Sequence, residues 1–267
     1  MGSRIIQAKL WGQHPGDWAD IQEPTGRAGY ESVLDTIPLN KDTRLLDIGC
    51  GTGYFCSLAE KAGAGHISGI DATPEFIKEA SRRVPAVAFL IGDMEDLPYE
   101  NTSFDVVCGF NSFQYAADTK NALLEVYRVL KVGGKLAAMI WGNKEDCEAA
   151  SYLKALGSLL PPPPPGAGGP FALTEENRLE HLMEAAGFTL YSVADIPAVW
   201  TYPDPATALK GLLSAGPAAK AIEHSGFEKV YRTVEDAIQP YLQSDGRLVL
   251  RNKFRVAIAD KSQVFQG

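Results

Sequence analysis

Leu45-Leu46-Asp47-Ile48-Gly49-Cys50-Gly51-Thr52-Gly53-Tyr54-Phe55 is an apolar run that ends in an acid and passes through three alternate glycines into a helical pattern. Glycines at these positions let the backbone turn sharply and approach a ligand closely. The dinucleotide fingerprint G-x-G-x-x-G has its third glycine one residue later and binds a pyrophosphate at the helix N-terminus. Because a carboxylate directly before the loop would oppose a phosphate, we expect a zwitterionic ligand whose ammonium Asp47 can approach.

Around this loop, short apolar runs alternate with helical patterns from Thr43 to Trp141. The expected strands are Arg44–Ile48, His66–Ile70, Val87–Ile91, Asp105–Phe110 and Lys135–Trp141, and the expected helices are Phe55–Ala62, Glu75–Arg83 and Thr119–Leu130. Such alternation is typical of a doubly wound α/β fold, in which helices cover both faces of a parallel sheet. Two further extended segments, Thr189–Tyr202 and Leu248–Ala259, predict an antiparallel pair at the edge and bring the sheet to seven strands.

The flanking segments predict covers over the sheet edge. Residues 1–40 form an N-terminal helical cap, and residues 41–260 form the main domain with a helical insertion at 205–245 that we expect to cover a substrate. A helix is expected over Glu145–Leu159, and the proline- and glycine-rich loop 161–170 after it is expected to act as a lid. Thr174 is expected to cap a helix that ends at Gly187.

Composition makes several classes of partner improbable. Lys and Arg number 25 against 33 Asp and Glu, which gives 25 − 33 = −8, so the average charge disfavours nucleic acid and anionic membrane surfaces. Apolar runs stay shorter than the ~18 residues of a membrane span, and we expect a cytoplasmic protein. Its four cysteines lack the spacing of a zinc site or a disulfide framework, and we expect no metal.

Acidic residues follow the next two expected strands. Asp71 ends the second strand and Asp93 follows the third, in Gly92-Asp93-Met94. An acid at the position of Asp71 can accept hydrogen bonds from both hydroxyls of a ribose. Because parallel strands present their carboxyl ends at one edge of the sheet, we expect Gly49, Asp71 and Asp93 to lie along one crevice. The alternative is that these acids only cap turns.

In these motifs the sequence resembles class I S-adenosylmethionine-dependent methyltransferases, in the small-molecule group related to ubiquinone and menaquinone biosynthesis. The resemblance covers about Thr43 to Trp141 and includes Gly92-Asp93, Phe104-Asp105-Val106-Val107 and Arg128-Val129-Leu130-Lys131-Val132-Gly133-Gly134. It implies a Rossmann-like fold and S-adenosyl-L-methionine as cofactor, with S-adenosyl-L-homocysteine as product. The residues that it implies, or that we infer, to bind the cofactor are Trp18, Asp47, Gly49, Gly51, Gly53, Asp71, Ala72, Asp93, Met94 and Asn111.

Three side chains are candidates for a proton acceptor near the substrate. His14 lies in the N-terminal segment, His224 ends a helix of the insertion, and Tyr115 follows Asn111 on the expected acceptor side. Histidine suits proton removal near neutral pH. The alternative is that His224 is only a helix-end residue and that proximity to the activated methyl group suffices without a base.

We therefore expect methyl transfer to the O, N or C atom of a small molecule. Two alternatives are a cyclase or isomerase that binds S-adenosylmethionine without transferring its methyl group, and a regulatory protein that only binds the nucleoside. The pattern Gly109-Phe110-Asn111-Ser112-Phe113 departs from the Asn/Asp-Pro-Pro-Tyr motif of enzymes that methylate exocyclic amines of bases, so adenine methylation loses support. The oligomeric state stays open between monomer and homodimer.

Overall fold

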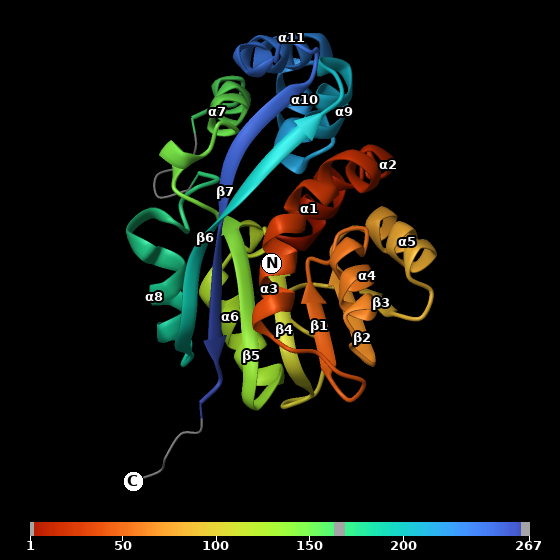
Figure 1. Cartoon of the computed structure of the whole chain (residues 1–267), viewed down its shortest axis with the longest axis vertical. Coiled ribbons are helices and arrows are strands. Elements are labelled where there is room, and N and C mark those ends of the chain that lie inside the picture. The colour runs from red at the N-terminus through yellow and green to blue at the C-terminus, as the bar shows by residue number, and fades with distance from the viewer. Residues whose placement is uncertain (1–2, 163–168, 263–267) are drawn as a thin grey trace.

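A seven-stranded sheet in the order β3-β2-β1-β4-β5-β7-β6 forms the centre of the molecule (Figure 1). The computed structural model describes residues 3–162 and 169–262. The strands are β1 (Arg44–Ile48), β2 (His66–Asp71), β3 (Ala88–Ile91), β4 (Phe104–Phe110), β5 (Leu130–Trp141), β6 (Thr189–Tyr202) and β7 (Leu248–Asp260). The first five strands are parallel, and β7 runs antiparallel between β5 and β6. The doubly wound α/β fold predicted from the sequence is confirmed.

Helices surround the sheet and extend beyond its carboxyl edge. The α-helices are α1 (Arg4–Trp11), α2 (Pro15–Asp17), α3 (Arg27–Thr36), α4 (Tyr54–Lys61), α5 (Pro74–Arg83), α6 (Thr119–Val129), α7 (Ala150–Ser158), α8 (Arg178–Ala185), α9 (Pro205–Leu213), α10 (Gly216–Ser225) and α11 (Phe227–Ile238). Shorter turns are the π-helical η1 (Trp18–Gln22) and the 3₁₀ segments η2 (Glu23–Gly26), η3 (Phe113–Tyr115), η4 (Lys144–Asp146), η5 (Glu175–Asn177) and η6 (Gln239–Tyr241). The long strands β6 and β7 reach the top of Figure 1, where α9, α10 and α11 gather.

Two hydrophobic layers hold the helices on the sheet. On one face, side chains of β1, β4, β5 and β7 pack against α3, α4 and the helices α7 and α9 to α11. On the other face, side chains of β1, β5 and β7 pack against α6 and α8. Alternate side chains of one strand enter opposite layers, as with Leu45 and Leu46, because the strands of a parallel sheet are buried on both faces.

Several boundaries differ from the sequence expectation. The helix expected from Glu145 begins only at Ala150, after the turn η4. Thr174 does not cap α8, because its hydroxyl donates a hydrogen bond to the carbonyl of Trp141 and the helix starts at Arg178. The expected antiparallel pair of β6 and β7 is present, with Thr189 opposite Asp260 at one end and Tyr202 opposite Leu248 at the other. Of the expected lid loop 161–170, residues 163–168 lie outside the described residues.

The glycine loop after β1 requires left-handed backbone. Gly49 and Gly51 have φ angles of +69° and +54°, a region that residues with a side chain adopt only at a cost. A Cβ atom at Gly51 would also lie 2.5 Å from the Glu23 carboxylate. Both glycines are therefore required for the loop to form, and Gly51 also leaves room for Glu23 to pack on it.

Membrane insertion by a helix finds no support in the described part of the chain. None of its helices combines the length and the apolar character that a bilayer crossing needs.

Candidate active site

A large cavity opens at the carboxyl edge of the sheet. It encloses about 1190 Å³ with its open mouth included, and strand ends form its floor while the N-terminal segment and helices α7 and α10 form its walls. The walls of this cavity differ in chemistry from one end to the other.

One end gathers most of the residues that the sequence assigned to the cofactor. Those that line the cavity are Trp18, Gly49, Gly51, Asp71, Ala72, Asp93, Met94 and Asn111. They come from the ends of β1, β2, β3 and β4 and from η1, so the crevice expected along the strand ends is present. Asp47 and Gly53 do not line the cavity. Gly53 is the residue before α4, where its φ of +77° turns the chain into the helix.

Asp71 is held rigidly at the end of β2. Its Oδ2 accepts a hydrogen bond from the Gly51 amide at 3.0 Å, and its Oδ1 accepts one from the Thr73 amide at 2.8 Å. Burial raises the pKa of Asp71, and these two amides oppose the shift. Each carboxylate oxygen has a further lone pair, so the group can also accept two hydroxyls from the cavity.

Asp47 lies beneath the loop rather than in the cavity wall. Asp47 is 1% exposed. Its Oδ2 lies 3.5 Å from the Cys56 sulfur, and its Oδ1 has no hydrogen-bond partner. Burial raises the pKa of Asp47 to about 8. The expectation of a carboxylate that approaches a ligand ammonium directly is therefore corrected, because β1 is a central strand and buries this side chain away from the cavity, and the burial favours its protonated form.

This burial predicts a pH dependence of stability that Asp47→Asn removes. Between pH ~4 and ~8 the unfolded chain ionises Asp47 while the folded chain keeps the proton, so the unfolded state binds fewer protons and stability falls as pH rises, by up to ~1.4 kcal/mol per pH unit. We expect Asp47→Asn to flatten the slope of the unfolding free energy measured by urea titration at pH 5, 6 and 7. The exposed Asp42→Asn serves as control, and an unchanged slope in Asp47→Asn would contradict a neutral buried acid.

Glu23 ties the N-terminal segment to the glycine loop. Its residue is 5% exposed, and its carboxylate accepts hydrogen bonds from the amide and hydroxyl of Thr52 and from the Arg83 guanidinium at 2.6 Å. Arg83 also donates to the carbonyls of Thr52 and Ala19, both at 2.9 Å. Burial raises the pKa of Glu23, and the charge of Arg83 opposes the shift. The ion pair fixes the loop against the segment that covers it.

The π-helical turn η1 directs Trp18 into the cavity. Trp18 stacks on Phe76 of α5, with ring centroids 6.0 Å apart, and its indole Nε1 is buried without a partner. The Ser112 hydroxyl, on the opposite side of the loop, is likewise buried without a partner. π-helical turns recur at functional sites. Unpaired donors and an acid with free lone pairs fit a ligand with hydroxyls, a carboxylate and a sulfonium, as the cofactor implied by the resemblance has.

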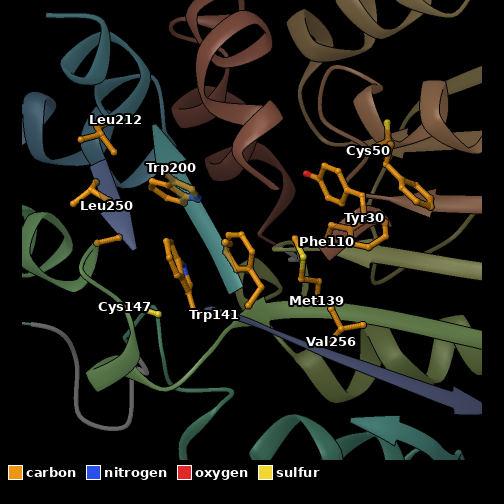
Figure 2. Close-up of a cluster of buried hydrophobic side chains, with 14 of the residues drawn as sticks. Tyr30, Cys50, Phe110, Met139, Trp141, Cys147, Trp200, Leu212, Leu250 and Val256 are labelled. Atoms are coloured by element: carbon orange, nitrogen blue, oxygen red, sulfur yellow. The ribbon is translucent and has the colours of Figure 1, made fainter. Parts of the chain in front are cut away.

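The other end of the cavity is aromatic. Trp141 at the end of β5, Trp200 on β6 and Phe254 on β7 pack with centroid distances of 5.3 Å to 6.4 Å. Figure 2 shows the two tryptophans of this group. Tyr152 and Leu153 of α7 complete the wall. We call this set of five residues the aromatic chamber. It lies across the cavity from Asp71 and Asp93 and extends from Phe110 at the end of β4.

The structure separates the three candidate proton acceptors. Tyr115 lines the cavity and contacts Trp11 with ring centroids 5.3 Å apart, and burial raises its pKa. His14 and His224 have exposed side chains and do not line the cavity. His224 lies in the last turn of α10, where its side chain faces solvent, so the expectation that these histidines face an acceptor is corrected.

Sequence reasoning left out several residues of the cavity wall. The sequence predicted no role for Glu23, because nothing in Gln22-Glu23-Pro24 indicates that Thr52 and Arg83 bind its carboxylate. The aromatic chamber was also unassigned, because Trp141, Trp200 and Phe254 come together only through the register of three strands. An indole at the last position of an expected strand, as at Trp141, was the available signal.

Comparison with known proteins gives a consistent picture. Residues 46–138 match the family described as "Methyltransferase domain". The chain is 33% identical over 141 residues to a 27-O-demethylrifamycin SV methyltransferase of Amycolatopsis mediterranei. The matched region covers 48% of this chain and 52% of the relative. It is 28% identical over 211 residues to a malonyl-[acyl-carrier protein] O-methyltransferase of Erwinia pyrifoliae, which covers 78% of this chain and 72% of the relative. The chain thus spans about half the length of the first of these relatives.

Solved structures share the fold. A putative methyltransferase of Bacillus halodurans superposes with a TM-score of 0.60 at 16% identity and covers 88% of this chain and 99% of its own. The [4+2]-cyclase SpnF superposes with a TM-score of 0.58 at 21% identity and covers 87% of this chain and 80% of its own. At these identities the likeness concerns the fold alone, which a transferase and a cyclase both use.

Proposed function

We propose that this chain, whose residues 46–138 match the methyltransferase domain family, is a class I S-adenosylmethionine-dependent methyltransferase that transfers the methyl group of S-adenosyl-L-methionine to a small-molecule acceptor. The single observation that carries the proposal is the two-ended cavity. One end presents carboxylates and unpaired donors on a glycine loop, and the other end presents aromatic rings. A cofactor and a second, less polar molecule fit these two ends.

Different residues bind different parts of the cofactor. Asp71 accepts the ribose hydroxyls, Asp93 and Met94 contact the adenine, and Gly49 and Gly51 let the backbone approach the methionine part. Trp18 covers the sulfonium, where an aromatic face contributes roughly 0.5–2 kcal/mol. When bound, S-adenosylmethionine supplies a methyl group already activated by the positive sulfur. The chain then has to hold the acceptor in line and exclude water, which can supply much of the rate.

Tyr115 is the proposed polar contact of the acceptor. A phenol is neutral at pH 7 and burial raises the pKa of Tyr115 further, so Tyr115 orients an acceptor by hydrogen bonding. We expect Tyr115→Phe to lower kcat about tenfold, the loss of one hydrogen bond, while the affinity for S-adenosylhomocysteine stays unchanged. His224→Ala serves as control and retains full turnover, because His224 is exposed outside the cavity. Equal turnover in both variants would leave Tyr115 without a part in the reaction.

Turnover with methyl-labelled S-adenosylmethionine and a library of small molecules tests the proposed reaction. We expect label in a small-molecule product and one S-adenosylhomocysteine per product. Product formation without S-adenosylhomocysteine would identify a cyclase or isomerase instead. Cofactor binding without any product across the library would favour a regulatory protein.

A further inference from the structure

The chemistry of the aromatic chamber restricts the acceptor, and the argument rests on the proposed function. Trp141 at the end of β5, Trp200 of β6 and Phe254 of β7 form three mutually contacting rings, with interplanar angles of 42° to 52°. Figure 2 shows the indoles of Trp141 and Trp200 side by side. Rings held by the register of β5, β6 and β7 cannot move apart easily, so the wall is preformed. Such a wall suits a flat ring, which stacks on it or meets it edge to face.

One polar atom in this wall has no partner within the protein. The indole Nε1 of Trp200 is buried and can only donate a hydrogen bond, and the described residues offer it no acceptor. The residue is 3% exposed and lines the cavity, and Figure 2 shows its nitrogen on the side away from Leu212 and Leu250. A buried donor left without a partner costs ~1–3 kcal/mol. An oxygen of a bound molecule would remove this cost.

The charges around the cavity also restrict which acceptor can bind. The charged side chains that line the cavity are Glu23, Asp71 and Asp93 at the cofactor end and Arg4 of α1, and none of them belongs to the aromatic chamber. Burying an ionised group among rings without a counter-charge is unfavourable, so a charged acceptor would lose affinity on entering the chamber. The part of the acceptor that enters is therefore uncharged.

We propose that the acceptor is an uncharged, ring-bearing molecule whose carbonyl or hydroxyl oxygen accepts a hydrogen bond from Trp200 Nε1. The ring packs against Trp141 and Phe254 while the oxygen fixes its orientation. Trp200 is thus a specificity-determining residue, and the hydrogen bond selects oxygenated rings over hydrocarbons of the same shape.

Three bicyclic probes test this assignment: α-tetralone, tetralin, which has the same skeleton without the oxygen, and the naphthoate anion. Calorimetry on the chain saturated with S-adenosylhomocysteine should show α-tetralone binding, with naphthoate about tenfold or more weaker. Naphthoate binding as tightly as α-tetralone would overturn the assignment. The titrations are repeated on the chain alone, so failure of S-adenosylhomocysteine to bind counts against the proposed function and leaves the chamber still tested.

Trp200→Phe isolates the hydrogen bond because it keeps a ring and removes the N–H group. We expect it to weaken α-tetralone about three- to tenfold and to leave tetralin within about twofold. Trp141→Phe is the matched control, in which the difference between the two probes persists. An equal effect of Trp200→Phe on both probes, or no effect on either, would overturn the proposal. Should Trp200→Phe fail to fold, NMR of the wild type decides, since hydrogen bonding to α-tetralone must move one indole N–H resonance further downfield than tetralin does.

Discussion

Arg83→Met is expected to lower the free energy of unfolding by about 3–5 kcal/mol, because it leaves the buried Glu23 carboxylate without its cation. The Arg83 guanidinium lies 2.6 Å from Glu23 and also donates to the Ala19 carbonyl. Its loss therefore loosens the N-terminal segment and the glycine loop together. Chemical denaturation followed by circular dichroism measures the change.

The adjacent residue provides the matched control. Arg82 pairs with Glu79 on the surface of the same helix, and its side chain is 76% exposed, so Arg82→Met should leave stability unchanged within error. The double variant Glu23→Gln/Arg83→Met should be more stable than Arg83→Met, because no buried charge is left unpaired. Equal stability of Arg83→Met and the wild type would contradict the role of this ion pair.

Asp71→Ala is expected to weaken S-adenosylhomocysteine by about 2–4 kcal/mol, because two charge-assisted hydrogen bonds to the ribose are lost. The amides of Gly51 and Thr73 also lose their acceptor, so part of the effect acts through the loop. Calorimetric titration of the folded variant measures the loss.

Asp105→Asn is the control for Asp71→Ala, because Asp105 is also a strand aspartate and pairs with Lys131 at the opposite end of β4. Its affinity for S-adenosylhomocysteine should equal that of the wild type. Unchanged affinity in a folded Asp71→Ala variant would mean that Asp71 only organises the turn after β2.

The sequence predicted the parts of the fold that local patterns encode. The ranges of β1 and β6 agree residue for residue, because alternating and continuous apolar runs bounded by turns mark strands directly. Thr174 shows where local reasoning stops, since its hydroxyl bonds the distant Trp141 carbonyl instead of the amides of the following helix. A competing tertiary partner cannot be inferred from the spacing of a capping residue.

The same distinction between local patterns and distant contacts applies to the candidate site. Asp71, Asp93 and the glycine loop follow from strand-end positions, which the topology of a parallel sheet brings together. The depth of a side chain does not follow from its position, and Asp47 is buried where exposure was expected. Glu23 and Trp200 became visible only through contacts between segments that lie far apart in the chain.

Calorimetric titration of the purified chain with S-adenosylmethionine, S-adenosylhomocysteine and NAD tests the central claim most directly. The glycine loop, whose Gly51 amide binds Asp71, lines the cofactor end of the cavity. We therefore expect saturable one-to-one binding of the first two ligands and no binding of NAD. Binding of NAD without binding of either sulfur-containing nucleoside would contradict the account.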